Sequence, residues 1–454
     1  MTSIKDHGAV GDGQVLDSPA IQRAIDAAAE AGGGRVTVPA GIYRCGTIRL
    51  RSHIELFLKP GAVIRASHDL ADYPAETTGE GLDTVSHFGM ALIRAENVES
   101  ISITGGTFDG QGPAFWEPSP GPRKWIPEKH PRVSPMFEFG RVKDLRLTDM
   151  TILDSPGWTV HLFCCDRVWI RGIRLDNNLF GPNTDGLDIN GCRDVMVSDC
   201  HISCGDDAIV LKTTKEARSC ERVVVTNCIL RSNCVAFKLG TESWHDFRQI
   251  TFSNSVAYQS SRLIGLFALD GGTMEQVRVD NISGDTNCGF AWNRPIHMDA
   301  SKRVAESGAS TIRDVTIRNL SAITDGRVIL TAADGCTIED VTIDGLSLKF
   351  PVIDNPDTEA ARRGKSIQCS RHSPEARVVP AAIVADGIKR LRLTNLGIRW
   401  PKGPPPEDWL TAQPGGLHDP EGDKRHVAKT FERIWSRDLE EEDVEVSGKS
   451  AWTV

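Results

Sequence analysis

Three aspartates in two short motifs carry the clearest chemistry in this sequence. The motifs are Asn183-Thr184-Asp185-Gly186 and Gly205-Asp206-Asp207, and Asp185 and Asp206 are 21 residues apart. Carboxylates held within several ångström of one another oppose joint ionisation, so at least one of their pKa values rises. A protonated carboxyl beside an ionised carboxylate is the pair that hydrolyses a glycosidic bond. The motifs therefore predict a glycoside hydrolase.

A repeated strand pattern supplies the elements that would position these aspartates. Each copy reads apolar, any residue, apolar, one residue, then Asn, Asp or Gly. The copies begin at Ile101, Leu145, Val168, Val195, Val223, Ile250, Val277, Val315, Val341 and Leu391. Five consecutive offsets between their last residues lie at 23–28, and the longer offsets indicate inserted loops. The repeat predicts an all-β fold, a right-handed single-stranded parallel β-helix of about ten coils.

The register of the repeat separates the three aspartates from ordinary turn residues. Asp199, Asn227 and Asn254 end strands of the repeat, and a purely structural role of this kind is the alternative for the three aspartates. Asp185, Asp206 and Asp207, however, lie off that register and gather in two coils only. Because coils stack about 4.8 Å apart, we expect the three carboxylates to lie on adjacent rungs.

The two ends of the chain are predicted to cover the open coils. Residues 1–50 read as an N-terminal cap with the first coils, and a helix is predicted over 18–31, beginning at Ser18-Pro19 and ended by three glycines. Its apolar stripe is Ile21, Ala24, Ile25 and Ala28. The stretch 400–454 is rich in proline and then in charge, and it is predicted to be a covering tail. We expect a single β-helix domain over 1–454.

Composition excludes several classes of protein. The chain has 454 residues, 40% of them hydrophobic and 25% charged, which is ordinary globular usage rather than that of a disordered chain. The net charge is −9 and no basic block is present, so no nucleic-acid partner is expected. No apolar run approaches the roughly 18 residues that a membrane span needs, so no membrane partner is expected. No signal peptide is visible, which predicts a cytoplasmic protein, or a secreted or periplasmic one if a signal has been removed.

The 12 cysteines fit a structural role. No Cys-x-x-Cys pair occurs, which argues against a zinc site. Cys192 and Cys220 are 28 residues apart, as are Cys200 and Cys228, so these cysteines are predicted to occupy equivalent positions on successive coils. We expect most of them to be reduced thiols that pack as small hydrophobic side chains.

Over roughly residues 3–350 the chain resembles glycoside hydrolase family 28, the polygalacturonase-like β-helix enzymes. The likeness rests on the two acidic motifs at the usual separation and on the N-terminal segments Asp6–Gly13 and Val38–Tyr43. In that family the first Asp of the Gly-Asp-Asp motif is the general acid, and the other two aspartates activate water, with inversion. The resemblance therefore implies that Asp206 is the acid and that Asp185 and Asp207 hold the nucleophilic water.

Two motifs of that family are absent from this chain. The family's Gly-His-Gly motif should fall near Asn233–Val235, where no histidine occurs. Its Arg-Ile-Lys motif should fall near Gly265–Leu269, where neither Arg nor Lys occurs. In polygalacturonases these cations resemble clamps for a uronate carboxylate, which a planar guanidinium suits. We therefore expect that the binding site next to the cleaved bond does not require a uronic acid, or else that the clamp is rearranged.

Other side chains are candidates for binding the substrate. The predicted substrate-binding residues are Asn183, Lys238, Glu242, Asp270, His161, Trp292 and Arg262. Further candidates are Lys212, one coil before Lys238 in the same register, and Trp244, Arg294 and His297. Each also has an ordinary structural alternative, since surface lysines, packed tryptophans and structural histidines are common.

The resulting functional hypothesis is hydrolysis of a pectin-type or related plant polysaccharide or oligosaccharide. Inserted loops at 107–140 and 285–313 are expected to close one end of a cleft, which favours exo action. No cofactor or metal is expected, and the oligomeric state stays open. Two alternatives are a polysaccharide lyase on the same fold and a non-catalytic glycan-binding β-helix. Binding alone does not call for a close acidic trio, and fold by itself does not decide between these classes.

Overall fold

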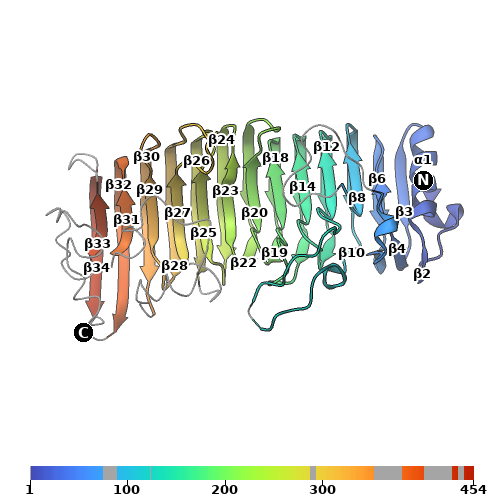
Figure 1. Cartoon of the computed structure of the whole chain (residues 1–454), viewed down its shortest axis with the longest axis horizontal. Coiled ribbons are helices and arrows are strands. Elements are labelled where there is room, and N and C mark those ends of the chain that lie inside the picture. Colours follow the sequence, from blue (N-terminus) through green and yellow to red (C-terminus); the bar gives the residue numbers. More distant parts are fainter. Residues whose placement is uncertain are drawn as a thin grey trace. The chain divides into compact units, whose positions relative to one another are not determined.

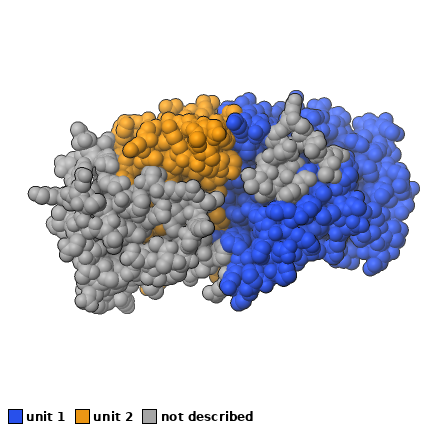
Figure 2. Space-filling model, viewed as in Figure 1, with its two compact units in different colours: residues 1–233 blue, residues 234–454 orange. Residues whose placement is uncertain are grey.

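The computed structural model describes residues 2–74, 89–122, 124–286, 293–351, 381–402, 432–437 and 444–453. Two compact units make up the chain, residues 1–233 and residues 234–454, coloured blue and orange in Figure 2. Each consists mainly of parallel strands (Figure 1). None of the helices in the described ranges has the length and apolar character needed to cross a membrane.

The first unit contains four helices and twenty-two strands among its described residues. The helices are η1 (Ile4–His7), α1 (Ser18–Glu30), η2 (Leu70–Asp72) and η3 (Gly112–Phe115). The strands are β1 (Thr2–Ser3), β2 (Asp12–Leu16), β3 (Gly34–Val38), β4 (Gly41–Cys45), β5 (Ile48–Arg49), β6 (Ile54–Leu58), β7 (Ala62–Ala66), β8 (Ile93–Glu96), β9 (Glu99–Thr104), β10 (Thr107–Asp109), β11 (Phe137–Gly140), β12 (Lys143–Thr148), β13 (Thr151–Leu153), β14 (Val160–Phe163), β15 (Asp166–Arg171), β16 (Arg174–Asp176), β17 (Leu187–Asn190), β18 (Arg193–Ser198), β19 (His201–Cys204), β20 (Ile209–Thr213), β21 (Cys220–Thr226) and β22 (Ile229–Ser232).

The described part of the second unit consists of longer strands. They are β23 (Val235–Ser243), β24 (Phe247–Ala257), β25 (Arg262–Ala268), β26 (Thr273–Asp285), β27 (Arg294–Ala300), β28 (Thr311–Ile323), β29 (Val328–Ala332), β30 (Thr337–Lys349), β31 (Ala381–Asp386), β32 (Ile388–Lys402), β33 (Glu432–Arg437) and β34 (Val444–Thr453).

The predicted repeat forms the stacked strands of both units. In the first unit, Leu145, Val168, Val195 and Val223 pair in register along β12, β15, β18 and β21, and all four are buried. In the second unit the same position is filled by Ile250, Val277, Val315, Val341 and Leu391, again in parallel register and buried. Alternate side chains therefore fill the interior, and the prediction of a right-handed parallel β-helix is confirmed.

The last residue of every repeat copy adopts a left-handed backbone conformation, as its residue type predicts. These ten residues are Gly105, Asp149, Gly172, Asp199, Asn227, Asn254, Asn281, Asn319, Gly345 and Asn395, with φ between 49° and 77°. In the first unit these residues separate two strands, as Asp149 does between β12 and β13, whereas in the second unit they lie within one long strand, as Asn254 does in β24.

The N-terminal helix matches its prediction closely. Helix α1 buries Ile21, Ala24 and Ile25 and contacts β3 (Figure 1). The Asp17 carboxylate accepts hydrogen bonds from the backbone N–H groups of Val10 and Gly11 at 2.6 and 3.0 Å, so it fixes the preceding loop rather than capping the helix.

Within residues 400–454, predicted as a covering tail, the described residues are strands. Strand β33 pairs in parallel with β31, and β34 pairs in parallel with β32. This part of the chain therefore extends the two sheets of its unit. The single-domain interpretation of residues 1–454 stays a prediction.

Candidate active site

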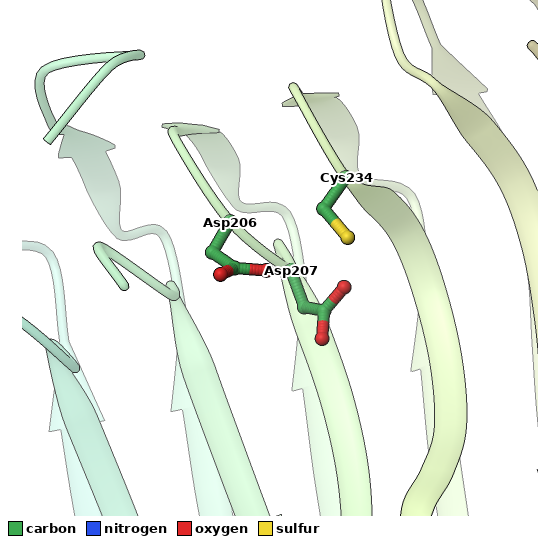
Figure 3. A group of neighbouring side chains, drawn as sticks. All are labelled: Asp206, Asp207 and Cys234. Atoms are coloured by element: carbon green, nitrogen blue, oxygen red, sulfur yellow. The ribbon is translucent and has the colours of Figure 1, made fainter. Parts of the chain in front are cut away.

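The three aspartates lie just before two paired strands of the first unit. Asp185 precedes β17, and Asp206 and Asp207 precede β20, with Leu187 and Ile209 opposite each other in the parallel register. The N–H of Gly186 donates to the carbonyl oxygen of Asp207 at 2.8 Å, so the pairing begins at the aspartates themselves. Figure 3 shows Asp206 and Asp207 side by side on one stretch of backbone. The predicted clustering on adjacent rungs is thus present.

Two glycines allow this close approach of backbone segments. A Cβ atom on Gly186 would lie 2.3 Å from the carbonyl oxygen of Ala208. One on Gly205 would lie 2.6 Å from Oγ1 of Thr184, the hydroxyl that accepts a hydrogen bond from the Gly205 N–H at 3.1 Å. The glycines of the two motifs therefore serve packing between the rungs.

Burial and mutual repulsion act together on the side chains of Asp185, Asp206 and Asp207, which form the acidic trio. Asp185 and Asp207 are each 2% exposed, whereas Asp206 is only partly buried. Burial, and next the negative charges of Asp206, Asp188 and Asp207, raise the pKa of Asp185 well above its usual value, and Lys212 opposes this rise. Asp185 therefore keeps its proton to a higher pH than an isolated aspartate does.

Asn183 and Arg132 meet beside the trio. Asn183 has a left-handed backbone, and its side-chain oxygen accepts a hydrogen bond from Nη2 of Arg132 at 3.2 Å. Sequence reasoning gave Asn183 a role in substrate binding, which stays a prediction, and did not single out Arg132. An arginine in an inserted loop gives no signal in sequence alone, because its burial is set by the fold.

His161, predicted to line the site, is fully buried in the first unit. Its Nδ1 lies 3.0 Å from Oε1 of Glu138, and its ring meets Trp158 edge-on with centroids 5.3 Å apart. Lys212 is also nearly buried, with Nζ 3.7 Å from Oδ1 of Asp188 and 4.9 Å from the centroid of Trp158. These contacts define a buried polar group next to the trio; direct contact of His161 with a sugar stays a prediction.

In the second unit, three of the predicted or candidate basic side chains surround Phe267. Nζ of Lys238 lies 5.7 Å and the guanidinium carbon of Arg262 5.9 Å from its ring centroid, and His297 meets it edge-on at 5.0 Å. Arg262 also donates to Nδ1 of His297 at 3.3 Å. Arg294 pairs in register with Arg262 on the neighbouring strand. These side chains are buried, so the candidate basic residues do gather within one unit.

Glu242 and Asp270, also predicted to bind substrate, are joined by Arg303. Its guanidinium donates to both carboxylate oxygens of Asp270 at 3.1 and 2.8 Å and to Oε1 of Glu242 at 2.9 Å. Burial raises the pKa of Asp270, while the Ser243 N–H and Arg303 oppose that rise. Sequence reasoning missed Arg303. Trp244 is partly buried, and Trp292 lies outside the described residues.

A parallel β-helix with two buried aspartates and one partly exposed aspartate at the start of two adjacent strands has the features of a polysaccharide-processing β-helix protein. Residues 75–370 match the family Glycosyl hydrolases family 28, and residues 1–69 match the family Rhamnogalacturonase A/epimerase, pectate lyase-like. The chain belongs to glycosyl hydrolases family 28, as the resemblance in its acidic motifs indicated.

Individual relatives agree with this assignment. A probable polygalacturonase of Vitis vinifera is 34% identical over 220 residues, covering 46% of this chain and 44% of that protein. The chain spans about two-fifths of the length of the first curated relatives that it matches, at 44%, 41% and 41%. Solved exopolygalacturonases of Thermotoga maritima (TM-score 0.65, 23% identity, 77% of this chain and 87% of that one) and Yersinia enterocolitica (0.69, 17%, 99% and 79%) share the fold.

Proposed function

We propose that this protein hydrolyses glycosidic bonds of a pectin-type or related plant polysaccharide or oligosaccharide, with inversion at the anomeric carbon. The observation that carries the proposal is the acidic trio, in which two aspartates are 2% exposed and a third is partly exposed. Family membership supports it, because the acidic motifs lie within the matched residues 75–370.

In the proposed mechanism, Asp206 donates a proton to the oxygen of the leaving sugar as the glycosidic bond breaks. Asp185 and Asp207 accept hydrogen bonds from one water and take up its proton as its oxygen bonds to the anomeric carbon. The exposure of the three side chains supports this division, since the acid must reach the glycosidic oxygen and Asp206 is the most accessible. Because burial raises the pKa of Asp185, this base is ionised only at a higher pH than an isolated aspartate, and the acidic limb of the pH–rate profile should report its ionisation.

We further propose that the subsite next to the cleaved bond does not require a uronic acid. The positions where the family's Arg-Ile-Lys clamp is expected carry Gly265–Leu269, at the end of β25 and just after it, where all five residues are buried and none is charged. Apolar side chains cannot replace a guanidinium that pairs with a carboxylate. A relocated clamp from Lys238, Arg262 or Arg294 is the competing outcome.

Exo action is proposed for the same site. The two exopolygalacturonases named above share the fold, and the segment between β10 and β11, predicted as an inserted loop, contacts the residues that lead into Asp185 through the bond between Arg132 and Asn183. A loop that closes one end of a substrate cleft restricts binding to chain ends. The expected product pattern is release of single residues or short units from the end of an oligosaccharide rather than random scission.

A screen of reducing-sugar release tests the proposal. The purified full chain and its Asp206→Asn variant are compared on a panel of galacturonan oligomers, rhamnogalacturonan fragments and neutral pectic oligosaccharides. We expect cleavage by the parent that the variant loses, on at least one neutral or mixed substrate. Failure to cleave any panel member would refute hydrolysis of pectic glycans. Cleavage of galacturonan far above every other substrate would refute the uronate-independent subsite and favour the relocated clamp.

A further inference from the structure

Arg132 is a fully buried cation from the segment between β10 and β11, and it contacts the segment carrying Asp185. Its side chain is 0% exposed. Nη1 donates to the carbonyl oxygen of Pro182 at 3.2 Å, and Nη2 donates to Oδ1 of Asn183 at 3.2 Å. Two branches of one guanidinium therefore bond the two successive residues at the turn that leads into Asp185.

The surroundings of Arg132 indicate a role beyond packing. Its Nε is buried and has no hydrogen-bond partner in the described part of the chain. Nη2 of Arg132 also forms an ion pair with Oε2 of Glu128 at 3.4 Å, and the side chain of Glu128 is 42% exposed. Burying a guanidinium while one of its donors stays unused, and while the carboxylate bonded to it is partly exposed to solvent, is costly for stability.

We propose that Arg132 is a positioning residue of the acidic trio: its guanidinium fixes the Pro182–Asn183 turn, from which Asp185 projects, and places a positive charge beside it. The proposal rests on the hydrolytic function proposed above. In the proposed mechanism Arg132 makes no bond to the reacting atoms. Arg132 acts instead on Asp185, whose orientation and charge state it influences.

The electrostatic consequence follows from the groups that face Asp185. Asp206, Asp188 and Asp207 disfavour its ionised form, and Lys212 favours it. Arg132 interacts with Asp185 with the same sign as Lys212, since the aspartate in turn favours the charged guanidinium. Glu128 offsets part of the charge of Arg132 and is itself 3.2 Å from Nε2 of His130. Removing Arg132 should therefore make Asp185 harder to ionise, and removing the charge of Glu128 should make it easier.

Two variants change the same interaction in opposite directions. In Arg132→Gln, kcat on the fastest panel substrate should fall about 10- to 100-fold with little change in KM, because a misplaced catalytic group of this kind costs up to about 100-fold. The acidic limb of its pH–rate profile should move up by about half a pH unit or more. In Glu128→Gln the acidic limb of the pH–rate profile should move to lower pH. Arg132→Lys retains the charge, so it should lose rate without moving the limb.

Arg167→Gln serves as a matched control, because it removes an exposed arginine paired with Asp144 in the same unit. It should leave kcat and both limbs unchanged. A circular dichroism spectrum establishes that each variant is folded. If Arg132→Gln does not fold, the positions of the acidic limb in Glu128→Gln and Arg132→Lys test the proposal instead. The limb should move down in the first variant and stay in place in the second. An acidic limb that stays in place in Arg132→Gln, or that moves the same way in Glu128→Gln, would overturn the proposal.

A readout without substrate separates this inference from the proposed function. The carboxyl ¹³C signal of Asp185 in protein labelled on aspartate, assigned with Asp185→Asn, gives the titration of that group directly. We expect it to titrate at higher pH in Arg132→Gln than in the parent. If the parent cleaves nothing but this shift is present, the hydrolytic function fails while the positioning of Asp185 stands. An unchanged titration refutes the positioning role whatever the activity.

Discussion

The ammonium nitrogen of Lys212 on β20 lies 3.7 Å from Oδ1 of Asp188 on β17, and both side chains are almost fully buried. Asp188 is also one of the charges that raise the pKa of Asp185, and Lys212 is the cation that opposes that rise. The pair therefore couples the stability of the first unit to the charge of its acidic trio.

Replacing Lys212 should destabilise the folded protein, because the buried carboxylate of Asp188 then loses the cation that pairs with it. For Lys212→Met we expect the free energy of unfolding, from urea titration, to fall by about 3–5 kcal/mol. Asp188→Leu in the same chain should restore most of the loss, since both charges are then absent. Arg222→Met removes an exposed pair with Asp194 and should cost about 1 kcal/mol or less. Equal losses in Lys212→Met and Arg222→Met would contradict this view of the buried pair.

Asp206→Asn keeps the shape of the side chain but removes its proton. We expect the rate on a natural oligosaccharide to fall by roughly 100- to 10,000-fold, the usual contribution of a general acid. The loss should be smaller on a nitrophenyl glycoside, whose leaving group needs less protonation. Asp185→Asn and Asp207→Asn should impair both kinds of substrate alike. Near-normal activity of Asp206→Asn on the oligosaccharide would move the search for the acid to Glu242 or Asp270.

Asp185 should reduce stability at neutral pH, because its folded-state pKa is raised. A raised carboxyl pKa means that ionisation in the folded state is unfavourable, so its penalty appears as pH rises through that pKa. Asp185→Asn should therefore raise Tm at pH 7 by about 2 °C or more. The gain should vanish as pH falls below the unfolded carboxyl pKa of about 4.

Asp144→Asn is a control whose expected change in Tm at pH 7 has the opposite sign to that of Asp185→Asn. Arg167 lowers the pKa of Asp144, so its ionised form stabilises the fold above that pKa. This variant should lower Tm at pH 7, slightly, because the pair is exposed. A Tm for Asp185→Asn at pH 7 at or below that of the parent would contradict an unfavourable buried charge.

The ten described cysteines form no disulfide, and seven of them are buried. Burial raises the pKa of thiols such as Cys192 and Cys204, which disfavours the reactive thiolate. Titration of the unfolded protein without reductant should find most of its 12 cysteines as free thiols. The folded protein should react slowly at these positions. Few free thiols after unfolding would contradict the packing role proposed for them.

The strand repeat made the fold predictable, because each copy ends at a residue whose left-handed backbone the structure bears out, from Gly105 to Asn395. The acidic trio was predictable for a similar reason: residues one coil apart must lie on adjacent rungs. Arg132 and Arg303 were not predictable. Each reaches its partners across a distance in sequence, 51 residues from Arg132 to Asn183, through loop conformations that no local pattern specifies.

The stereochemistry of the product tests the central claim most directly. Hydrolysis of the fastest panel substrate is followed by ¹H NMR from the first minutes, and the isolated product sugar in the same buffer gives the rate of mutarotation. We expect the newly formed reducing end to appear first in the anomeric configuration opposite to that of the cleaved bond. A reducing end of retained configuration would contradict single displacement by the trio, and an unsaturated sugar would show a lyase instead.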